Sequence, residues 1–282
     1  MQWQERDGVW TLVPPRPVAL IHFLGGALVA AVPQLTYRWL LDKLARRGYG
    51  IVATPFLNGS LDHWAIAAAV GESFERSRRW LYETGQVRRR YLPVYGLGHS
   101  MGCKLHLLLA SEGAAGNRAG NIFISFNNFS ARRAVPLGDR FAPLLESVVD
   151  SVARSIPGSV PADFLDSSTR EFTPTPDETE AIAARLYPIR RNLLIRFRND
   201  DLDQSGRIYR QLEPRFAGSL TLKTLPGNHL TPLGQDVNWR PVGGNFSPVD
   251  ALGQWVKQEF FYRDLERLYQ EIARWLDPTR PL

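Results

Sequence analysis

Leu92-Pro93-Val94-Tyr95-Gly96-Leu97-Gly98-His99-Ser100-Met101-Gly102 is the stretch that decides the fold. Its first six residues form a short, mostly apolar run that is typical of a buried strand. The last five form a Gly-x-Ser-x-Gly pentapeptide, and three leucines after it share one face of a helix: Leu105, Leu108 and Leu109. A serine in this context occupies a sharp turn between a strand and a helix, where the glycines prevent side-chain collisions. We therefore expect Ser100 at the carboxyl end of a sheet, in the position of a nucleophile.

Strands and helices alternate on both sides of this motif. Apolar runs predict further strands at residues 18–23, 50–55, 121–126, 192–197 and 220–225. Helical patterns cover residues 35–44, 61–84, 205–216 and 265–276. Such alternation is typical of a mostly parallel sheet covered by helices on both faces. The sequence therefore predicts an α/β fold.

The regular alternation is lost between residues 128 and 188, where prolines interrupt short helical patterns. We expect this segment, 128–188, to be an inserted helical cap on a core made of residues 1–127 and 189–282. A chain of 282 residues that is 44% hydrophobic can form one such domain with a full core. No stretch approaches the roughly 18 consecutive apolar residues of a membrane-spanning helix.

A nucleophilic serine needs a base within hydrogen-bond reach, and the sequence has five histidines from which to choose. His99 is the variable residue beside the serine and should point away from it. His106 lies too far along the following helix, and His63 is expected on the surface or as a helix cap. His22 ends the first long strand, on the side expected to hold the oxyanion site. His229, in a loop directly after the last predicted strand, is left as the base.

The loop after the predicted strand 192–197 offers the orienting carboxylate. An acid in this kind of site usually follows its strand by a few residues, which favours Asp200 and then Asp201. The alternative position, after the strand 121–126, carries asparagines instead of a carboxylate. The choice between Asp200 and Asp201 stays open.

The oxyanion site should combine two backbone N–H groups. One belongs to Met101, at the start of the helix after the serine. The other comes from the loop after the first long strand, around Phe23, Leu24 and Gly25. No His, Cys or carboxylate residues cluster at metal-ligand spacing, so we expect no metal and no cofactor.

The chain resembles the α/β-hydrolase superfamily of the serine hydrolase type. More narrowly, it resembles an uncharacterised domain-of-unknown-function branch that is common in photosynthetic lineages. The resemblance is carried by five segments, at residues 21–26, 98–102, 124–128, 199–205 and 227–232. It implies the α/β-hydrolase fold with a helical cap and a catalytic triad in the order serine, acid, histidine.

These observations predict a serine hydrolase that cleaves a small-molecule ester or thioester through an acyl-enzyme intermediate. Two alternatives stay open: a non-catalytic hydrolase-fold binding or scaffold protein, and an acyltransferase that uses the same nucleophile. The net charge of +6 comes mainly from dispersed arginines without a nucleic-acid motif, so we expect no nucleic-acid partner, with peripheral membrane contact as the alternative. The single cysteine, Cys103, fits a reducing compartment. We expect a cytoplasmic protein, with a plastid or membrane-peripheral location as alternatives; the oligomeric state is not predicted.

Overall fold

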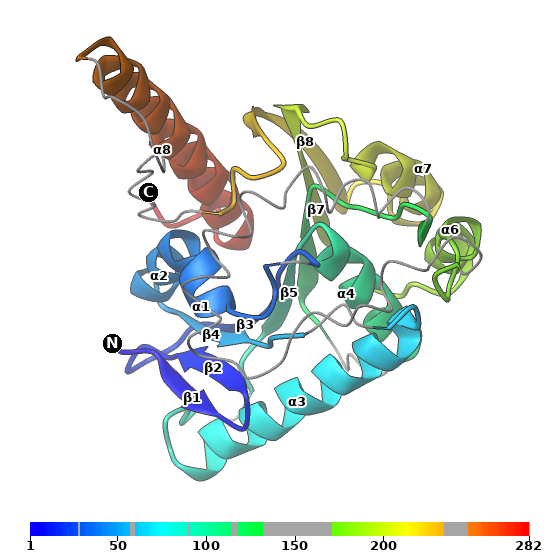
Figure 1. The fold of residues 1–282 in the computed structure, drawn as a ribbon. Helices are drawn as coiled ribbons and strands as arrows, with labels where there is room; N and C mark the ends of the chain where they lie inside the picture. Colours follow the sequence, from blue (N-terminus) through cyan, green and yellow to red (C-terminus); the bar gives the residue numbers. More distant parts are fainter. Residues whose placement is uncertain are drawn as a thin grey trace.

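The described residues form a central sheet of eight strands in the order β1-β2-β4-β3-β5-β6-β7-β8, with buried apolar runs in its middle, seen in the computed structural model in Figure 1. The structure describes residues 1–27, 29–56, 60–89, 91–113, 118–131, 171–233 and 248–281, with only the backbone for 248–261. Six strands run parallel: β3 (Ala19–Leu24), β4 (Tyr49–Ala53), β5 (Val94–His99), β6 (Gly120–Ile124), β7 (Asn192–Asn199) and β8 (Leu220–Asn228). The predicted strands and the mostly parallel α/β sheet are confirmed.

A short hairpin at the N-terminus, which the sequence analysis did not predict, extends the sheet on one side. Its strands are β1 (Gln4–Arg6) and β2 (Val9–Leu12), and β2 pairs antiparallel with β4. Asp7 and Gly8 form the turn with positive φ angles of 50° and 77°. Asp-Gly is a favoured pair for such two-residue turns, so this hairpin had a readable signal.

The helices divide between the two faces of the sheet (Figure 1). One face is covered by α1 (Pro33–Thr36), α2 (Arg38–Arg46) and the second half of α8 (Pro248–Leu276). The other is covered by α3 (His63–Glu83), α4 (Met101–Ser111), α6 (Pro176–Arg185) and α7 (Ser205–Phe216). Among the described residues, no helix is long and apolar enough to cross a membrane.

The predicted cap falls mostly outside the described residues, because 132–170 are not among them. Its described end contains α6, which begins with a capping box between Thr175 and Glu178. Ala183 of α6 and Tyr187 just after it are fully buried in the cluster under α4 and α7. The described end of the segment therefore packs against the core, and the boundaries 128–188 stay a prediction.

The parallel strands bring three chain segments to one edge of the sheet. β5 ends at His99, β7 at Asn199 and β8 at Asn228, and Asn199 pairs with Asn228. The residue after each strand end is Ser100, Asp200 or His229. Because parallel strands end at a common edge, residues far apart in the sequence become neighbours here.

Candidate active site

Ser100 sits in a strained turn between β5 and α4. Its φ of 54° and ψ of −120° are rare for a residue with a side chain. A Cβ atom on Gly98 would lie 2.7 Å from the backbone nitrogen of Cys103, and one on Gly102 would lie 2.6 Å from the carbonyl oxygen of Gly25. Both positions of the motif therefore require glycine, because neighbouring backbone atoms leave no room for a Cβ atom.

Ser100, His229 and Asp200 are joined by hydrogen bonds. The Ser100 hydroxyl lies 3.1 Å from Nε2 of His229. Nδ1 of the same ring lies 3.0 and 3.1 Å from the two carboxylate oxygens of Asp200. The turn that carries His229 is held by Thr231, whose hydroxyl accepts the N–H of Asn228 at 2.8 Å. The geometry matches a nucleophile, a base and an orienting acid.

The acid and the base are both shielded from solvent, the acid more completely. The Asp200 side chain is completely shielded and that of His229 is 12% exposed. Burial by itself raises the pKa of Asp200, but the hydrogen bond and the charge of His229 outweigh it, so the pKa is held below its usual value. The N–H of Leu202 also donates to Asp200 at 3.0 Å. Asp200 is therefore held ionised beside the histidine.

The three aspartates of this loop have different surroundings. Asp200 contacts His229, whereas Asp201 is exposed in the turn. Asp203 accepts a hydrogen bond from the Ser205 hydroxyl at 2.6 Å and thereby supports the start of α7. Of the two candidates for the acid, Asp200 makes the hydrogen bond to the imidazole of His229.

The predicted oxyanion segment divides into strand and loop. Phe23 and Leu24 are the last residues of β3 and pair with β4 and β5, whereas Gly25 lies beyond the strand. The loop approaches the serine one residue later, since a Cβ atom on Gly26 would lie 3.4 Å from Cβ of Ser100. Met101 is the first residue of α4, as expected for a donor at a helix N-terminus.

Two of the remaining histidines lie elsewhere than predicted. His63, expected on the surface or as a helix cap, is only 3% exposed and its ring stacks on Phe172 at 4.3 Å, and the residue that caps α3 is Asp62. His22, expected beside the oxyanion site, is buried against α3, where it contacts Thr54 at 3.1 Å and Arg118 at 2.9 Å. Both errors arise because partners from other elements enclose these rings, which a local pattern cannot show.

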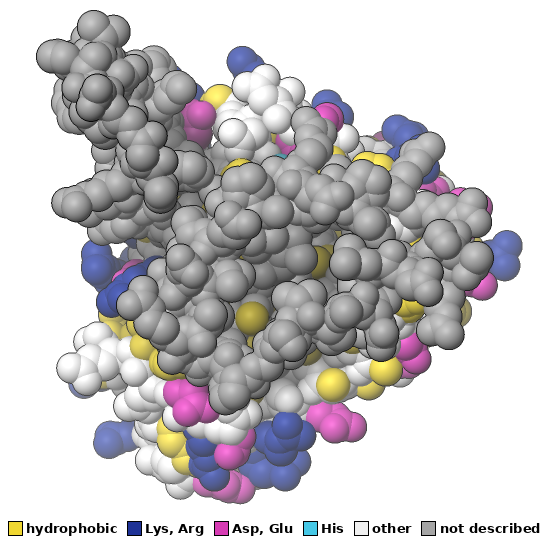
Figure 2. Space-filling view, in the orientation of Figure 1, with side chains coloured by type: hydrophobic (Ala, Val, Ile, Leu, Met, Phe, Trp, Pro, Cys, Tyr) yellow, Lys and Arg dark blue, Asp and Glu magenta, His cyan; other side chains and the backbone are white. Residues whose placement is uncertain are grey.

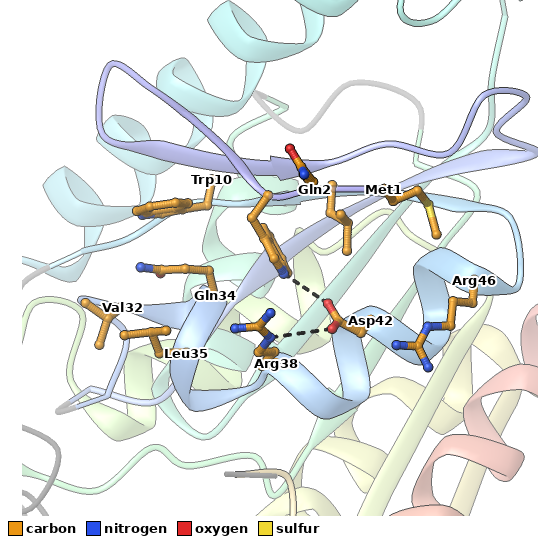
Figure 3. Close-up of a pocket in the computed structure, with 11 residues that line it drawn as sticks. Met1, Gln2, Trp10, Val32, Gln34, Leu35, Arg38, Asp42 and Arg46 are labelled. Atoms are coloured by element: carbon orange, nitrogen blue, oxygen red, sulfur yellow. Dashed lines mark hydrogen bonds and ion pairs between the residues drawn. The ribbon is translucent and has the colours of Figure 1, made fainter. Parts of the chain in front are cut away.

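A cavity of about 830 Å³ lies away from these residues, between the N-terminal hairpin and α1 and α2 (Figure 3). Trp3 and Trp10 line it together with Arg38 and Asp42 of α2. Trp3 Nε1 donates to Asp42 at 2.9 Å. Ser100, Asp200 and His229 do not line this cavity, so it is separate from the candidate active site.

The described basic side chains lie close to acidic ones around the edge of the face in Figure 2. On α3, Arg78 pairs with Glu75 at 2.6 Å and Arg76 with Glu72 at 3.9 Å. Exposed pairs of this kind contribute little to stability, but they offset part of the positive charge locally. Contact with an acidic membrane stays a prediction.

Solved structures similar to this one have the α/β-hydrolase fold. An esterase of Pyrococcus furiosus is 12% identical, with a TM-score of 0.52 over 90% of this chain and 85% of its own. The substrate-bound fluorophosphonate-binding serine hydrolase F of Staphylococcus aureus is 12% identical, with a TM-score of 0.50 over 81% and 90%. S-formylglutathione hydrolase of the same organism is 14% identical, with a TM-score of 0.50 over 78% and 85%. At these identities the likeness establishes the fold, and the α/β-hydrolase fold is confirmed.

The sequence itself matches one family over nearly its whole length. That family is described as "Protein of unknown function (DUF1350)", and the match covers residues 2–278. No curated protein matches the sequence.

Proposed function

Because the chain belongs to the DUF1350 family and has the α/β-hydrolase fold, we propose that it is a serine hydrolase. The substrate is a small-molecule ester or thioester, cleaved through an acyl-enzyme intermediate. One observation carries the proposal: the continuous chain of hydrogen bonds from Asp200 through His229 to Ser100. A hydroxyl next to a base that a buried carboxylate orients is the arrangement that makes serine nucleophilic.

In the proposed reaction, the Ser100 hydroxyl attacks the acyl carbon and His229 takes its proton. The imidazolium formed in this step is stabilised by Asp200. His229 then returns the proton to the leaving alcohol or thiol, and the bond between the acyl carbon and that leaving group breaks. A water molecule then gives a proton to His229 and attacks the acyl carbon of the acyl-enzyme. His229 returns this proton to the Ser100 oxygen, the bond between that oxygen and the acyl carbon breaks, and the free acid leaves.

The negative charge on the substrate oxygen is stabilised by backbone N–H groups. The N–H of Met101 is one donor, aided by the positive end of the α4 dipole. The second donor belongs to the loop after β3, at Gly25. Besides the substrate and one water molecule, these steps use only groups of the protein.

Labelling with fluorophosphonates tests the proposal without knowledge of the substrate. Intact-mass detection should show one adduct on the wild type and none on Ser100→Ala or His229→Ala. Ser111→Ala, at the other end of α4, is the matched control and should label like the wild type. A folded wild type that reacts with neither a small nor a long-chain fluorophosphonate would overturn the proposal and favour a non-catalytic binding protein.

The substrate class is tested next, with nitrophenyl esters and acyl thioesters of increasing chain length. Adding an alcohol to the hydrolysis assay then shows whether the acyl group passes to water or to the alcohol. Release of free acid as the main product supports the hydrolase. A new ester formed faster than the free acid would instead identify an acyltransferase.

A further inference from the structure

A buried chain of hydrogen bonds passes through Tyr37 and His99, next to the candidate triad. The N–H of Gly26 donates to the Tyr37 hydroxyl at 2.8 Å. That hydroxyl lies 2.7 Å from Nδ1 of His99, and Nε2 of His99 lies 3.0 Å from the backbone carbonyl oxygen of His229. Tyr37 is fully buried and His99 is 2% exposed.

Each of these hydrogen bonds has only one possible direction when His99 is neutral. A carbonyl oxygen cannot donate, so Nε2 of His99 carries the hydrogen and donates to His229. Nδ1 of a neutral ring is then an acceptor, so the Tyr37 hydroxyl donates to it. The Tyr37 oxygen is left free to accept the N–H of Gly26. Burial, with a smaller effect from His229, lowers the pKa of His99 to about 3, which keeps the ring neutral at ordinary pH.

These hydrogen bonds connect three segments whose relative positions the proposed reaction depends on. Gly26 belongs to the loop after β3 and approaches Ser100 closely. His99 is the last residue of β5 and directly precedes Ser100. The carbonyl oxygen of His229 belongs to the turn after β8. Three strands of the sheet thus contribute one segment each, and Tyr37 and His99 join the segments.

We propose that Tyr37 and His99 are positioning residues that hold the oxyanion loop and the backbone of His229 in place around Ser100. The proposal rests on the serine hydrolase function above. Neither side chain touches the reacting atoms in this scheme: His99 points to Tyr37 and to the backbone of His229, away from the Ser100 hydroxyl. Since a displacement of about 1 Å can cost 100-fold in rate, loss of either hydrogen bond should reduce turnover rather than binding.

Tyr37→Phe removes the hydroxyl and keeps the ring that packs on Phe23 at 4.6 Å. We expect kcat to fall by about 10- to 100-fold while KM stays within about threefold, because the hydroxyl acts on geometry in the transition state. Tyr187→Phe is the matched control. Tyr187 is also fully buried, and its hydroxyl bonds to Asn121 and Asn192 on the opposite face of the sheet. This variant should lose a similar amount of stability and retain its kcat.

Two replacements of His99 separate its two hydrogen bonds. Glutamine can place an N–H near the position of Nε2 and should retain the bond to the His229 carbonyl. Asparagine can place its oxygen near Nδ1 and should retain the bond to Tyr37. Phenylalanine makes neither bond. We expect His99→Gln and His99→Asn each to retain more activity than His99→Phe, whose kcat should fall at least as far as that of Tyr37→Phe.

Histidine-selective NMR with ¹⁵N labelling provides a readout that does not depend on activity. The His99 ring should stay in the neutral form with hydrogen on Nε2 between pH 8 and pH 5. In Tyr37→Phe the ring signals of His229 should shift, whereas in Tyr187→Phe they should not. If the wild type reacts with no fluorophosphonate, the proposed function fails, and these signals still decide whether Tyr37 and His99 position His229.

The proposal is overturned by either of two results. One is a folded Tyr37→Phe variant with kcat within twofold of the wild type and unchanged His229 signals. The other is an equal loss of kcat in Tyr37→Phe and Tyr187→Phe, since that would trace the effect to stability alone.

Discussion

Acidification from pH 7.5 to pH 5 should strongly destabilise the protein, because four of its histidines are buried in the neutral form. The burial of His22, His63, His99 and His106 lowers the pKa of each ring, to about 3 for His63 and His99. In the unfolded chain each ring regains a pKa of about 6.5. The unfolded state therefore binds more protons below this value, and stability falls as the pH falls from 6.5.

The magnitude depends mainly on the unfolded-state pKa. At pH 5 the unfolded-state pKa of each ring is about 1.5 units above the pH, and the folded-state pKa of His63 and of His99 is well below the pH. At 1.36 kcal/mol per unit, these two rings cost about 2 kcal/mol each, or about 4 kcal/mol together, and His22 and His106 add to the loss in the same direction. A domain with ordinary stability of about 5–15 kcal/mol would lose a large part of it over this range.

Urea denaturation at pH 7.5, 6.5, 5.5 and 5.0 measures this loss as a change in the free energy of unfolding. Calorimetry in buffers of different ionisation enthalpy should show uptake of roughly two protons from His63 and His99 on unfolding at pH 5.5, with further uptake from His22 and His106. His63→Phe is the sharpest single test, because among the described residues neither ring nitrogen of His63 has a hydrogen-bond partner and the ring stacks on Phe172. This variant should lose about 2 kcal/mol of the pH dependence. A total loss below about 3 kcal/mol between pH 7.5 and pH 5 would refute the reasoning.

Three further outcomes are expected. Asp200→Asn should slow fluorophosphonate labelling by about 10³- to 10⁴-fold, whereas Asp201→Asn should label within a fewfold of the wild type; equal losses would contradict the assignment of the acid. Gly102→Ala should lower the free energy of unfolding in urea by about 3 kcal/mol, because the new Cβ meets the carbonyl oxygens of Leu24 and Gly25. Gly206→Ala in α7 is its control and should change stability by less than about 1 kcal/mol, because the new Cβ has ample space there. Burial lowers the pKa of Lys104 to about 7, whereas an unfolded lysine has a pKa of about 10.4. The unfolded chain therefore binds more protons between pH 7 and pH 9, and raising the pH over this range should add about 2 kcal/mol of stability to the wild type and none to Lys104→Met.

Local patterns in the sequence were enough to predict most of the fold. Apolar runs such as 192–197 and helical stripes such as 265–276 were enough to predict a mostly parallel sheet with helices on both faces. They succeed because a strand buried on both faces must be apolar along its whole length, whatever its neighbours are. The hairpin at Asp7-Gly8 was missed although its turn residues were readable, because the strands beside it are only three and four residues long.

The candidate site was predictable as far as strand ends could be found. Ser100, the aspartates of the loop at 200–203, and His229 each follow a strand, and parallel strands end at a common edge. The sequence by itself therefore determined the α/β class and the three loops that meet. It favoured Asp200 over Asp201 without deciding between them, because adjacent residues point in different directions and only the path of the backbone decides which one faces the imidazole.

Only the tertiary structure decided the surroundings of the buried polar groups. No pattern places Tyr37, from the start of α2, against His99 at the end of β5, or encloses His63 against Phe172. These two contacts join residues that are 62 and 109 positions apart in the sequence. The first exists because a buried donor or acceptor must find a partner within about 3 Å, and the second because the ring of His63 is enclosed by apolar surface from another segment. In both, the packing of the helices on the sheet determines which residues meet.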